Sequence, residues 1–270
     1  MFKTRLLSGI VLVIILIATV GTGGGLLFGF LALISLIGLS ELYKVVDVQN
    51  KILGLTGYLG AVVYYGILYT GQMQYVTLLT IAFLVVLMAV YVFSFPTFKA
   101  EQVMTVFFGV FYVAVMLSYV YQTRMLEDGA VAVWLIFLSS WGCDTCAYCA
   151  GKLFGKHKLA PTISPKKTVE GAAGGALGTM LVMTVYALCV KHFAAVNLNL
   201  PGVIILGILC GIFSQTGDLC ASIIKREHGI KDFGHIMPGH GGVMDRFDSL
   251  IFVSPIVYYF ISFFPIFTAR

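Results

Sequence analysis

Nine apolar segments, each close to the length that crosses a lipid bilayer, constrain the fold of this chain most strongly. They cover residues 6–20, 26–43, 54–70, 75–95, 103–121, 130–151, 174–190, 201–222 and 247–267. About 20 helical residues span the roughly 30 Å hydrocarbon layer. Only 11% of the residues are charged, against about 25% in soluble domains, which excludes a single water-soluble core. The segments predict an all-α, polytopic transmembrane helical bundle of about nine spans.

The first residues, MFKTRLLSGIVLVIILIATVGTGGG, are similar to a secretory signal, with basic residues before an apolar core. No A-x-A cleavage site follows this core, and eight further apolar segments do. We interpret the stretch as an uncleaved first span.

The basic residues predict which side of the membrane each loop faces. If the N-terminus is inside, all but three of the 17 lysines and arginines lie on the cytoplasmic face. The three exceptions are Arg124, Lys191 and Arg270. We therefore expect a multi-pass protein of the cell's inner (plasma) membrane with a cytoplasmic N-terminus. The net charge of +5 is mostly this asymmetry and does not by itself indicate a nucleic-acid partner.

Polar residues are uncommon in the first half of the chain and gather in three clusters in the second half. This contrast separates N-terminal transmembrane spans (1–125) from a catalytic transmembrane region (126–270), which we expect to form one integrated domain. Glu41 is the exception in the first half: it either caps or pairs with Lys44, or it approaches the site. All three clusters fall at the cytoplasmic ends of spans, which predicts a single site facing the cytoplasm.

The first cluster is DTCAYCAGK. On a helix, Asp144, Tyr148 and Gly151 share one face. An aspartate within a span costs roughly 2.5–3.5 kcal/mol. We therefore expect Asp144 to meet a metal or a substrate, and a bond to a tyrosine or a neighbouring helix is the structural alternative.

The second cluster is SPKKTVEGAAGG, just before the seventh span. A helix start with free N–H groups beside Lys166, Lys167 and Thr168 is suited to anions. A simple positive-inside loop is the alternative. Gly174 and Gly178 form G-x-x-x-G, which is most simply a face for helix packing.

The third cluster covers residues 214–249. Asp218, Ser222 and Lys225 follow one another along one helix face, and the turn PGHGG lets backbone N–H groups approach a ligand. Asp245 and Asp248 share a face at the next helix start. Carboxylate oxygens suit Mg²⁺, which bridges protein carboxylates and substrate phosphates. Together the clusters predict phosphate chemistry with a metal.

Cys143, Cys146 and Cys149 form C-x-x-C-x-x-C, a spacing that also occurs in zinc and iron–sulfur sites. Here the three cysteines lie in an apolar helix and a full ligand set is missing. We interpret them as small packing residues.

The run from Ser222 to Asp248 has the pattern S-x-x-K-R-x4-K-D-x-G-x5-H-G-G-x2-D-R-x-D. It resembles the motif of the phosphatidate cytidylyltransferases, the CDP-diacylglycerol synthases. The shorter blocks QTGDL, DTCAY and SPKKTVEG resemble the same family. The resemblance covers about residues 140–252, and it departs from the family pattern at Met237 and Cys146 without removing a polar group.

This resemblance implies an enzyme that transfers the cytidylyl group of CTP to phosphatidate, giving CDP-diacylglycerol and pyrophosphate for phospholipid synthesis. It implies Mg²⁺ as cofactor, with or without a second cation, and a homodimer. The expected partners are CTP, phosphatidate and the lipid bilayer. Two alternatives stay open: a CTP-dependent transferase or kinase for an isoprenoid lipid, and a cation or organic-anion transporter.

Under this hypothesis the polar residues of the three clusters fall into catalytic, substrate-binding and metal-binding groups. The catalytic residues are Asp218, Lys225, Arg226, Asp245, Arg246 and Asp248. The substrate-binding residues are Lys166, Lys167, Thr168, Ser222, Lys231, His240, Gly241 and Gly242. The metal ligands are Asp218 and Asp245, with Asp144 and Asp248 assisting or holding a second cation.

Overall fold

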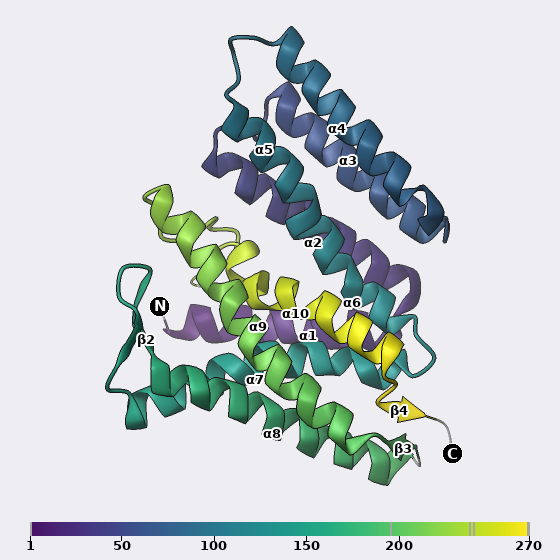
Figure 1. Cartoon of the computed structure of the whole chain (residues 1–270), viewed down its shortest axis with the longest axis vertical. Coiled ribbons are helices and arrows are strands. Elements are labelled where there is room, and N and C mark those ends of the chain that lie inside the picture. Colours follow the sequence, from purple (N-terminus) through teal and green to yellow (C-terminus); the bar gives the residue numbers. More distant parts are fainter. Residues whose placement is uncertain (1, 195, 238, 240, 269–270) are drawn as a thin grey trace. The chain divides into compact units, whose positions relative to one another are not determined.

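The computed structural model describes residues 2–194, 196–237, 239 and 241–268, with side chains from residue 7 onward (Figure 1). The described chain is almost entirely helical. Its helices are α1 (Phe2–Thr22), α2 (Gly24–Val45), α3 (Ile52–Tyr69), α4 (Val76–Phe93), α5 (Ala100–Gly109), α6 (Met116–Arg124), α7 (Gly129–Phe154), α8 (Val169–Ala194), α9 (Leu200–Glu227) and α10 (Met244–Phe263). A 3-10 turn, η1 (Met73–Tyr75), precedes α4, and a π-helical stretch, η2 (Val110–Val115), joins α5 to α6. The all-α prediction is confirmed.

Within the described residues, eight helical segments are long and apolar enough to cross a membrane. They are α2, α3, η1 with α4, the continuous α5–η2–α6, α7, α8, α9 and α10. The apolar part of α1, Leu7–Thr22, is shorter than these and corresponds to the first predicted segment. The polytopic membrane fold predicted from the sequence is confirmed.

The chain divides into two compact units. The N-terminal unit contains residues 1–118 and 232–246, and the C-terminal unit contains residues 119–231 and 247–270. The segment 232–246 thus packs with the N-terminal helices, although it follows α9 in the sequence. Helix α10 begins in the first unit and continues in the second.

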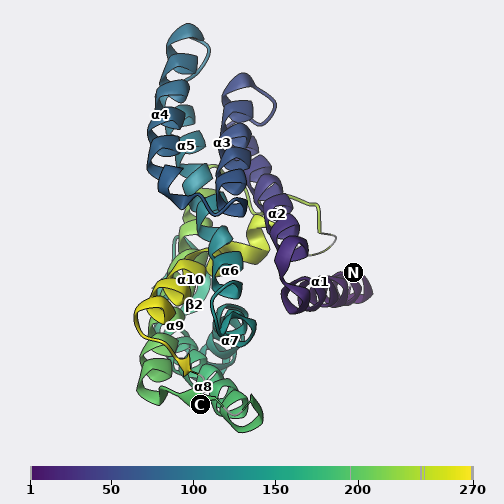
Figure 2. The same cartoon turned by 90° about the vertical axis from the view of Figure 1, so that its right-hand side faces the viewer.

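Buried tyrosines connect the helices of the N-terminal unit, whose α3, α4 and α5 run side by side (Figure 2). The hydroxyl of Tyr43 on α2 donates to the carbonyl of Val106 on α5 at 3.0 Å. The hydroxyl of Tyr65 on α3 lies 2.7 Å from that of Ser35 on α2. A hydroxyl without a partner is costly in an apolar interior, so these pairs favour one packing of the helices.

In the C-terminal unit, α7, α8 and α9 lie side by side (Figure 1). Gly174 and Gly178 of α8 contact Ala150 and Cys146 of α7, and at either glycine a methyl group would collide with those side chains. Small residues let membrane helices approach closely. The predicted packing role of the G-x-x-x-G pair is confirmed.

Helix α9 meets the other side of α8 in the same way. A methyl group on Gly211 would lie 2.5 Å from the Cα atom of Ala176, and one on Gly207 would lie 2.6 Å from the Cα atom of Met180. These are contacts with backbone atoms, which cannot move away as a flexible side chain can. The glycines therefore set the distance between α8 and α9.

The C-terminal unit also contains two short antiparallel pairs of strands. Strand β1 (Lys158–Ala160) pairs with β2 (Ser164–Thr168) in the connection from α7 to α8. Strand β3 (Asn197–Leu198) pairs with β4 (Phe267–Thr268) and joins the start of α9 to the end of the chain.

We expect Gly211→Ala to destabilise the protein by about 1–3 kcal/mol, the usual effect of overpacking a tight interior. The control is Gly142→Ala on α7, where the added methyl group would meet Val182 at 3.6 Å, an ordinary van der Waals distance. The measurement is thermal unfolding of the two variants in detergent micelles. Equal midpoints for both variants would contradict the close contact of α8 with α9.

Candidate active site

The β1–β2 hairpin carries the predicted phosphate-binding lysines, and both its ends are tied to the first turn of α8. The Glu170 carboxylate accepts hydrogen bonds from the backbone N–H groups of Lys156 at 3.0 Å and His157 at 3.2 Å, and it lies 2.6 Å from Nδ1 of His157. At the other end, Oγ1 of Thr168 accepts the N–H of Gly171 at 3.1 Å. A hydroxyl in this position caps the helix, so hydrogen bonds at both ends anchor the hairpin to α8.

A cavity of about 380 Å³ lies between α7, this hairpin, α8 and α9; we call it the α7–α9 cavity. Its lining is Asp144, Ala147, Tyr148, Gly151, Lys152, Leu159, Lys166, Lys167, Thr168, Gly171, Ala172, Gln215 and Asp218. The predicted residues Asp144, Lys166, Lys167, Thr168 and Asp218 are all part of it. Residues of all three sequence clusters therefore meet at one place.

Opposite charges face each other in this cavity. Nζ of Lys167, on the hairpin, forms an ion pair with the carboxylate of Asp218, on α9. Lys152 and Lys166 add two more positive charges, and the exposed Tyr148 adds a hydroxyl. Lysine ammonium groups bind phosphates as point charges, so the cavity is equipped for an anionic substrate.

Asp248 lies next to Asp218 across the contact of α9 with α10. At Gly217 the two helices approach so closely that a methyl group would lie 2.7 Å from the carbonyl oxygen of Asp248. The Asp248 side chain is buried, and its charge interacts with those of Asp218, Lys225 and Asp144. One carboxylate oxygen accepts the N–H of Ser249 at 2.7 Å. Three of the four predicted metal ligands thus lie within electrostatic range of one another.

The remaining predicted residues of α9 have different surroundings. Oγ of Ser222 is 3.5 Å from Oδ1 of Asp218, at the limit of a hydrogen bond. Arg226 donates to two backbone carbonyls, those of Ile163 at 3.3 Å and Ile230 at 3.2 Å. Arg226 thus links the hairpin to the end of α9 through its hydrogen bond to Ile163. Lys231 is exposed beyond that end.

The predicted residues Gly241, Gly242, Asp245 and Arg246 belong to the N-terminal unit. Oδ2 of Asp245 accepts the N–H groups of Phe233 at 2.8 Å and Gly242 at 2.9 Å, and so ties Phe233 and Gly242 to the start of α10. Arg246 is exposed in the first turn of α10. The predicted residue His240 lies outside the described residues.

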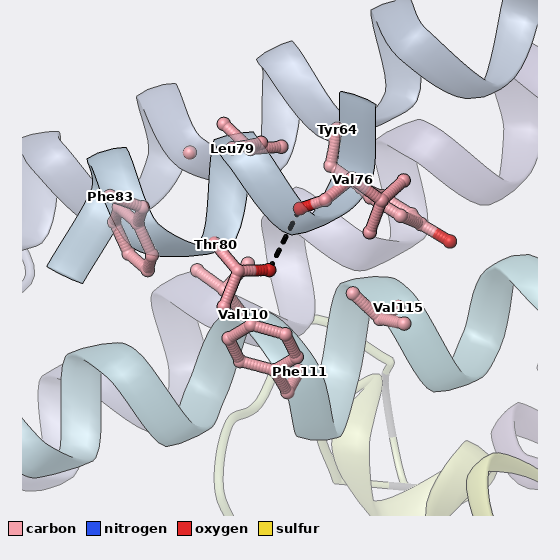
Figure 3. A pocket seen from close by; sticks show the side chains of 9 residues that line it. Tyr64, Val76, Leu79, Thr80, Phe83, Val110, Phe111 and Val115 are labelled. Atoms are coloured by element: carbon pink, nitrogen blue, oxygen red, sulfur yellow. Dashed lines mark hydrogen bonds between the residues drawn. The ribbon is translucent and has the colours of Figure 1, made fainter. Parts of the chain in front are cut away.

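A further cavity, of about 10 Å³, lies between α3, α4 and η2 of the N-terminal unit (Figure 3). Its lining is mostly apolar and includes Phe83 and Val110. Thr80 turns its hydroxyl back to the carbonyl of Val76 at 2.9 Å, as the dashed line shows. This volume accommodates about one water molecule at most, which excludes a substrate site.

Three polar residues with a place in these arrangements were not among the predicted site residues. Lys152 and Gln215 line the α7–α9 cavity, and helix periodicity from Asp144 and Asp218 was the signal that could have found them. Gln215 also donates to the carbonyl of Ala172 at 3.0 Å and ties α9 to α8. Glu41 accepts backbone N–H groups of the loop before α10, and nothing in its own neighbourhood of the sequence indicates that contact.

Two of the three cysteines of the C-x-x-C-x-x-C run pack against neighbouring helices, and Cys149 is exposed. Cys143 is buried and its thiol lies 3.4 Å from the carbonyl of Gly211, and Cys146 packs on Gly178. In the described part of the chain, no three His, Cys, Asp or Glu side chains are grouped closely enough to hold a metal by themselves.

The chain is similar to known proteins over nearly its whole length. A model of the cytidylyltransferase family matches residues 3–264. The phosphatidate cytidylyltransferase of Staphylococcus haemolyticus (strain JCSC1435) is 36% identical over 262 residues, covering 94% of this chain and 97% of the relative. The enzymes of the same name from Staphylococcus saprophyticus and Staphylococcus aureus (strain COL) are 35% and 34% identical, with the same two coverages. The similarity therefore includes the N-terminal helices as well as residues 140–252.

We expect Lys167→Ala to weaken the binding of pyrophosphate about 10- to 100-fold, because a hydrogen bond to a charged group contributes about 1.5–3 kcal/mol. The control is Lys158→Ala, which removes an exposed lysine of the same hairpin that does not line the cavity. Isothermal titration calorimetry of the purified protein measures both. An equal loss in the two variants would mean that the hairpin attracts anions only through its net charge.

Proposed function

The chain belongs to the cytidylyltransferase family, and we propose that the α7–α9 cavity is the place where it transfers the cytidylyl group of CTP to phosphatidate. The products are CDP-diacylglycerol and pyrophosphate. The observation that carries the assignment is the meeting of three lysines with Asp144 and Asp218 in one cavity of an otherwise apolar protein. Charged residues at membrane helices are costly and indicate a functional site.

The reaction is a displacement at phosphorus. A phosphate oxygen of phosphatidate forms a bond to the α-phosphorus of CTP, and the bond from that phosphorus to the pyrophosphate oxygen breaks. Such a transfer depends on positioning and on neutralising charge rather than on covalent catalysis. The attacking phosphate is already ionised near neutral pH, so no general base is needed.

The side chains of the cavity supply these two requirements. Lys166 and Lys167 bind substrate phosphates, and they stabilise the charge that accumulates on the departing pyrophosphate. Thr168 and Ser222 are hydrogen-bond donors to the same groups. Lys225, whose charge acts on Asp248, adds a further positive charge. The parts of Arg226, Lys231, Arg246, His240, Gly241 and Gly242 in binding or catalysis stay predictions from the motif.

The carboxylates fit a magnesium ion. Mg²⁺ is usually bound by one or two protein carboxylates together with waters and substrate phosphates. Asp144 and Asp218 line the cavity, and Asp248 is within range of both charges. Asp144 and Asp218 would hold the ion together with waters and substrate phosphates, and the ion would neutralise charge on the reacting phosphates. Asp245 and a second cation stay predictions of the resemblance.

The membrane supplies one substrate and the cytosol the other. Phosphatidate enters from the inner leaflet, and CTP arrives from the cytoplasm. The excess of lysine and arginine in the loops on the side of the β1–β2 hairpin supports a cytoplasmic active site and N-terminus in the plasma membrane.

The homodimer stays a prediction of the family resemblance. Gly174 and Gly178 of α8 pack against α7, and Gly207 and Gly211 of α9 pack against α8, so these four glycines are used within one copy of the chain. Neither an isoprenoid substrate nor a transport function is favoured, because the relatives described above are phosphatidate cytidylyltransferases.

The test of the activity is pyrophosphate release by the detergent-solubilised protein, with Mg²⁺, CTP and phosphatidate each omitted in turn. We expect release only with all three, together with a CDP-lipid product. Asp218→Asn should lower kcat by at least about 10²-fold, as does the loss of one transition-state contact in other enzymes. Asp47→Asn, at an exposed aspartate paired with Lys51, is the control. Near-normal turnover of Asp218→Asn would refute the role of this carboxylate.

The orientation is tested with single cysteines in a chain whose six cysteines are replaced by alanine. Lys158→Cys, in the hairpin, should react with a membrane-impermeant thiol reagent only after the cells are permeabilised. Gln72→Cys lies in the turn between α3 and α4. It should react in intact cells, because the proposed orientation places this turn on the outer face of the membrane. The reverse pattern would overturn the proposed orientation.

A further inference from the structure

Glu41 is a buried carboxylate at the end of α2 whose partners all lie far along the sequence. Its side chain is 4% exposed. Oε1 accepts the backbone N–H of Val243 at 3.0 Å, and Oε2 accepts the N–H of Met244 at 2.9 Å. The first N–H groups of a helix have no partner within the helix. Glu41 therefore caps α10 with a side chain from a different membrane helix.

The loop before α10 is shaped around this carboxylate. A methyl group on Gly242 would lie 2.5 Å from both carboxylate oxygens of Glu41, and one on Gly234 would collide with Oε1. Neither glycine has a positive φ angle, so the backbone conformation does not require glycine at these positions. The close approach of Glu41 does.

The same loop is closed by Asp245. The N–H of Met237 donates to the carbonyl of Gly241 at 3.0 Å, while Asp245 accepts the N–H groups of Phe233 and Gly242. Together Glu41 and Asp245 accept four backbone N–H groups of the segment 233–244. Two carboxylates thus hold described residues of this segment, and one of them comes from the first half of the chain.

We propose that Glu41 is a positioning residue for cytidylyl transfer: it holds Gly234, Gly242 and the first turn of α10 in the conformation that receives substrate phosphate. This inference rests on the proposed function, because the motif assigns the loop to phosphate binding. Glu41 acts only through the backbone it holds. The amides it engages are those of Val243 and Met244, beside the predicted phosphate-binding glycines Gly241 and Gly242.

A carboxylate suits this task better than an amide. Its two oxygens are both acceptors, whereas a glutamine presents one acceptor and one donor. In Glu41→Gln, one of the two N–H groups would face an NH₂ group and lose its hydrogen bond. The volume of the side chain barely changes, so the substitution tests the acceptor and its charge rather than the packing.

The first experiment is hydrogen exchange of the loop, measured by mass spectrometry on the full-length protein in detergent, in parallel with steady-state kinetics. In Glu41→Gln we expect the amides of residues 241–247 to exchange about 10- to 100-fold faster, because a buried N–H loses its charged acceptor. We expect KM for CTP to rise by a similar factor, with little change in KM for phosphatidate. Glu101→Gln, at an exposed glutamate in the first turn of α5, should match the wild type in both measurements.

The two measurements separate failure of this inference from failure of the proposed function. If the amides of residues 241–247 exchange at the wild-type rate in Glu41→Gln, Glu41 does not anchor the loop. Faster exchange with an unchanged KM for CTP overturns the link between the loop and the nucleotide. A wild-type protein without CTP-dependent turnover refutes the proposed function, while the exchange data still decide whether Glu41 holds the loop.

A second pair of variants tests the contact without relying on the folding of Glu41→Gln. Gly234→Ala should lower kcat/KM for CTP, because its methyl group collides with Glu41. Adding Glu41→Asp, which shortens the acid by one methylene group, should restore part of that loss. If the fold loss of kcat/KM in the double variant equals the product of the fold losses in the two single variants, Glu41 and Gly234 are not coupled and the proposal fails.

Discussion

The close approach of α7, α8 and α9 at their glycines is the contact on which the rest of the C-terminal unit depends. Lipid is as apolar as the helix surfaces, so membrane helices associate through tight packing and hydrogen bonds rather than through hydrophobic burial. Gly174 and Gly178 let α8 pack closely on α7, and Gly207 and Gly211 let α9 pack closely on α8. This stack brings Asp144 and Asp218, which are distant in the sequence, to the lining of one cavity.

Acidic side chains have two tasks in this protein. Asp144, Asp218 and Asp248 bring negative charge to the α7–α9 cavity or to its neighbourhood, where the lysines balance part of it. Glu41, Asp245 and Glu170 instead accept backbone N–H groups at helix starts and in the turns beside them. Unsatisfied N–H groups are especially costly where water is scarce. Charged acceptors at these places make the polar segments rigid between apolar helices.

Much of the site followed from local patterns. Helix periodicity correctly placed Asp144, Tyr148 and Gly151 on one face, since all three line the cavity. The positions of Lys166 and Lys167 just before a helix start predicted a place in the site, and both lysines line the cavity. Lys152 and Gln215 lie on the same helices as Asp144 and Asp218, so helix periodicity could have predicted them as well. The contact of Arg226 with the Ile163 carbonyl could not be predicted, because it depends on where a hairpin folds back.

By itself the sequence determined the membrane class, the helical fold and the family. Long apolar runs have no other stable form in lipid, and clustered charges between them indicate a charged ligand. The tertiary structure decided which polar groups meet. Glu41 shows this most clearly: the sequence offered Lys44 as a nearby partner, yet the Glu41 carboxylate lies against Gly234 and Gly242. Such a contact between distant segments depends on how the helices pack, and the residues around Glu41 do not indicate which distant segment it meets.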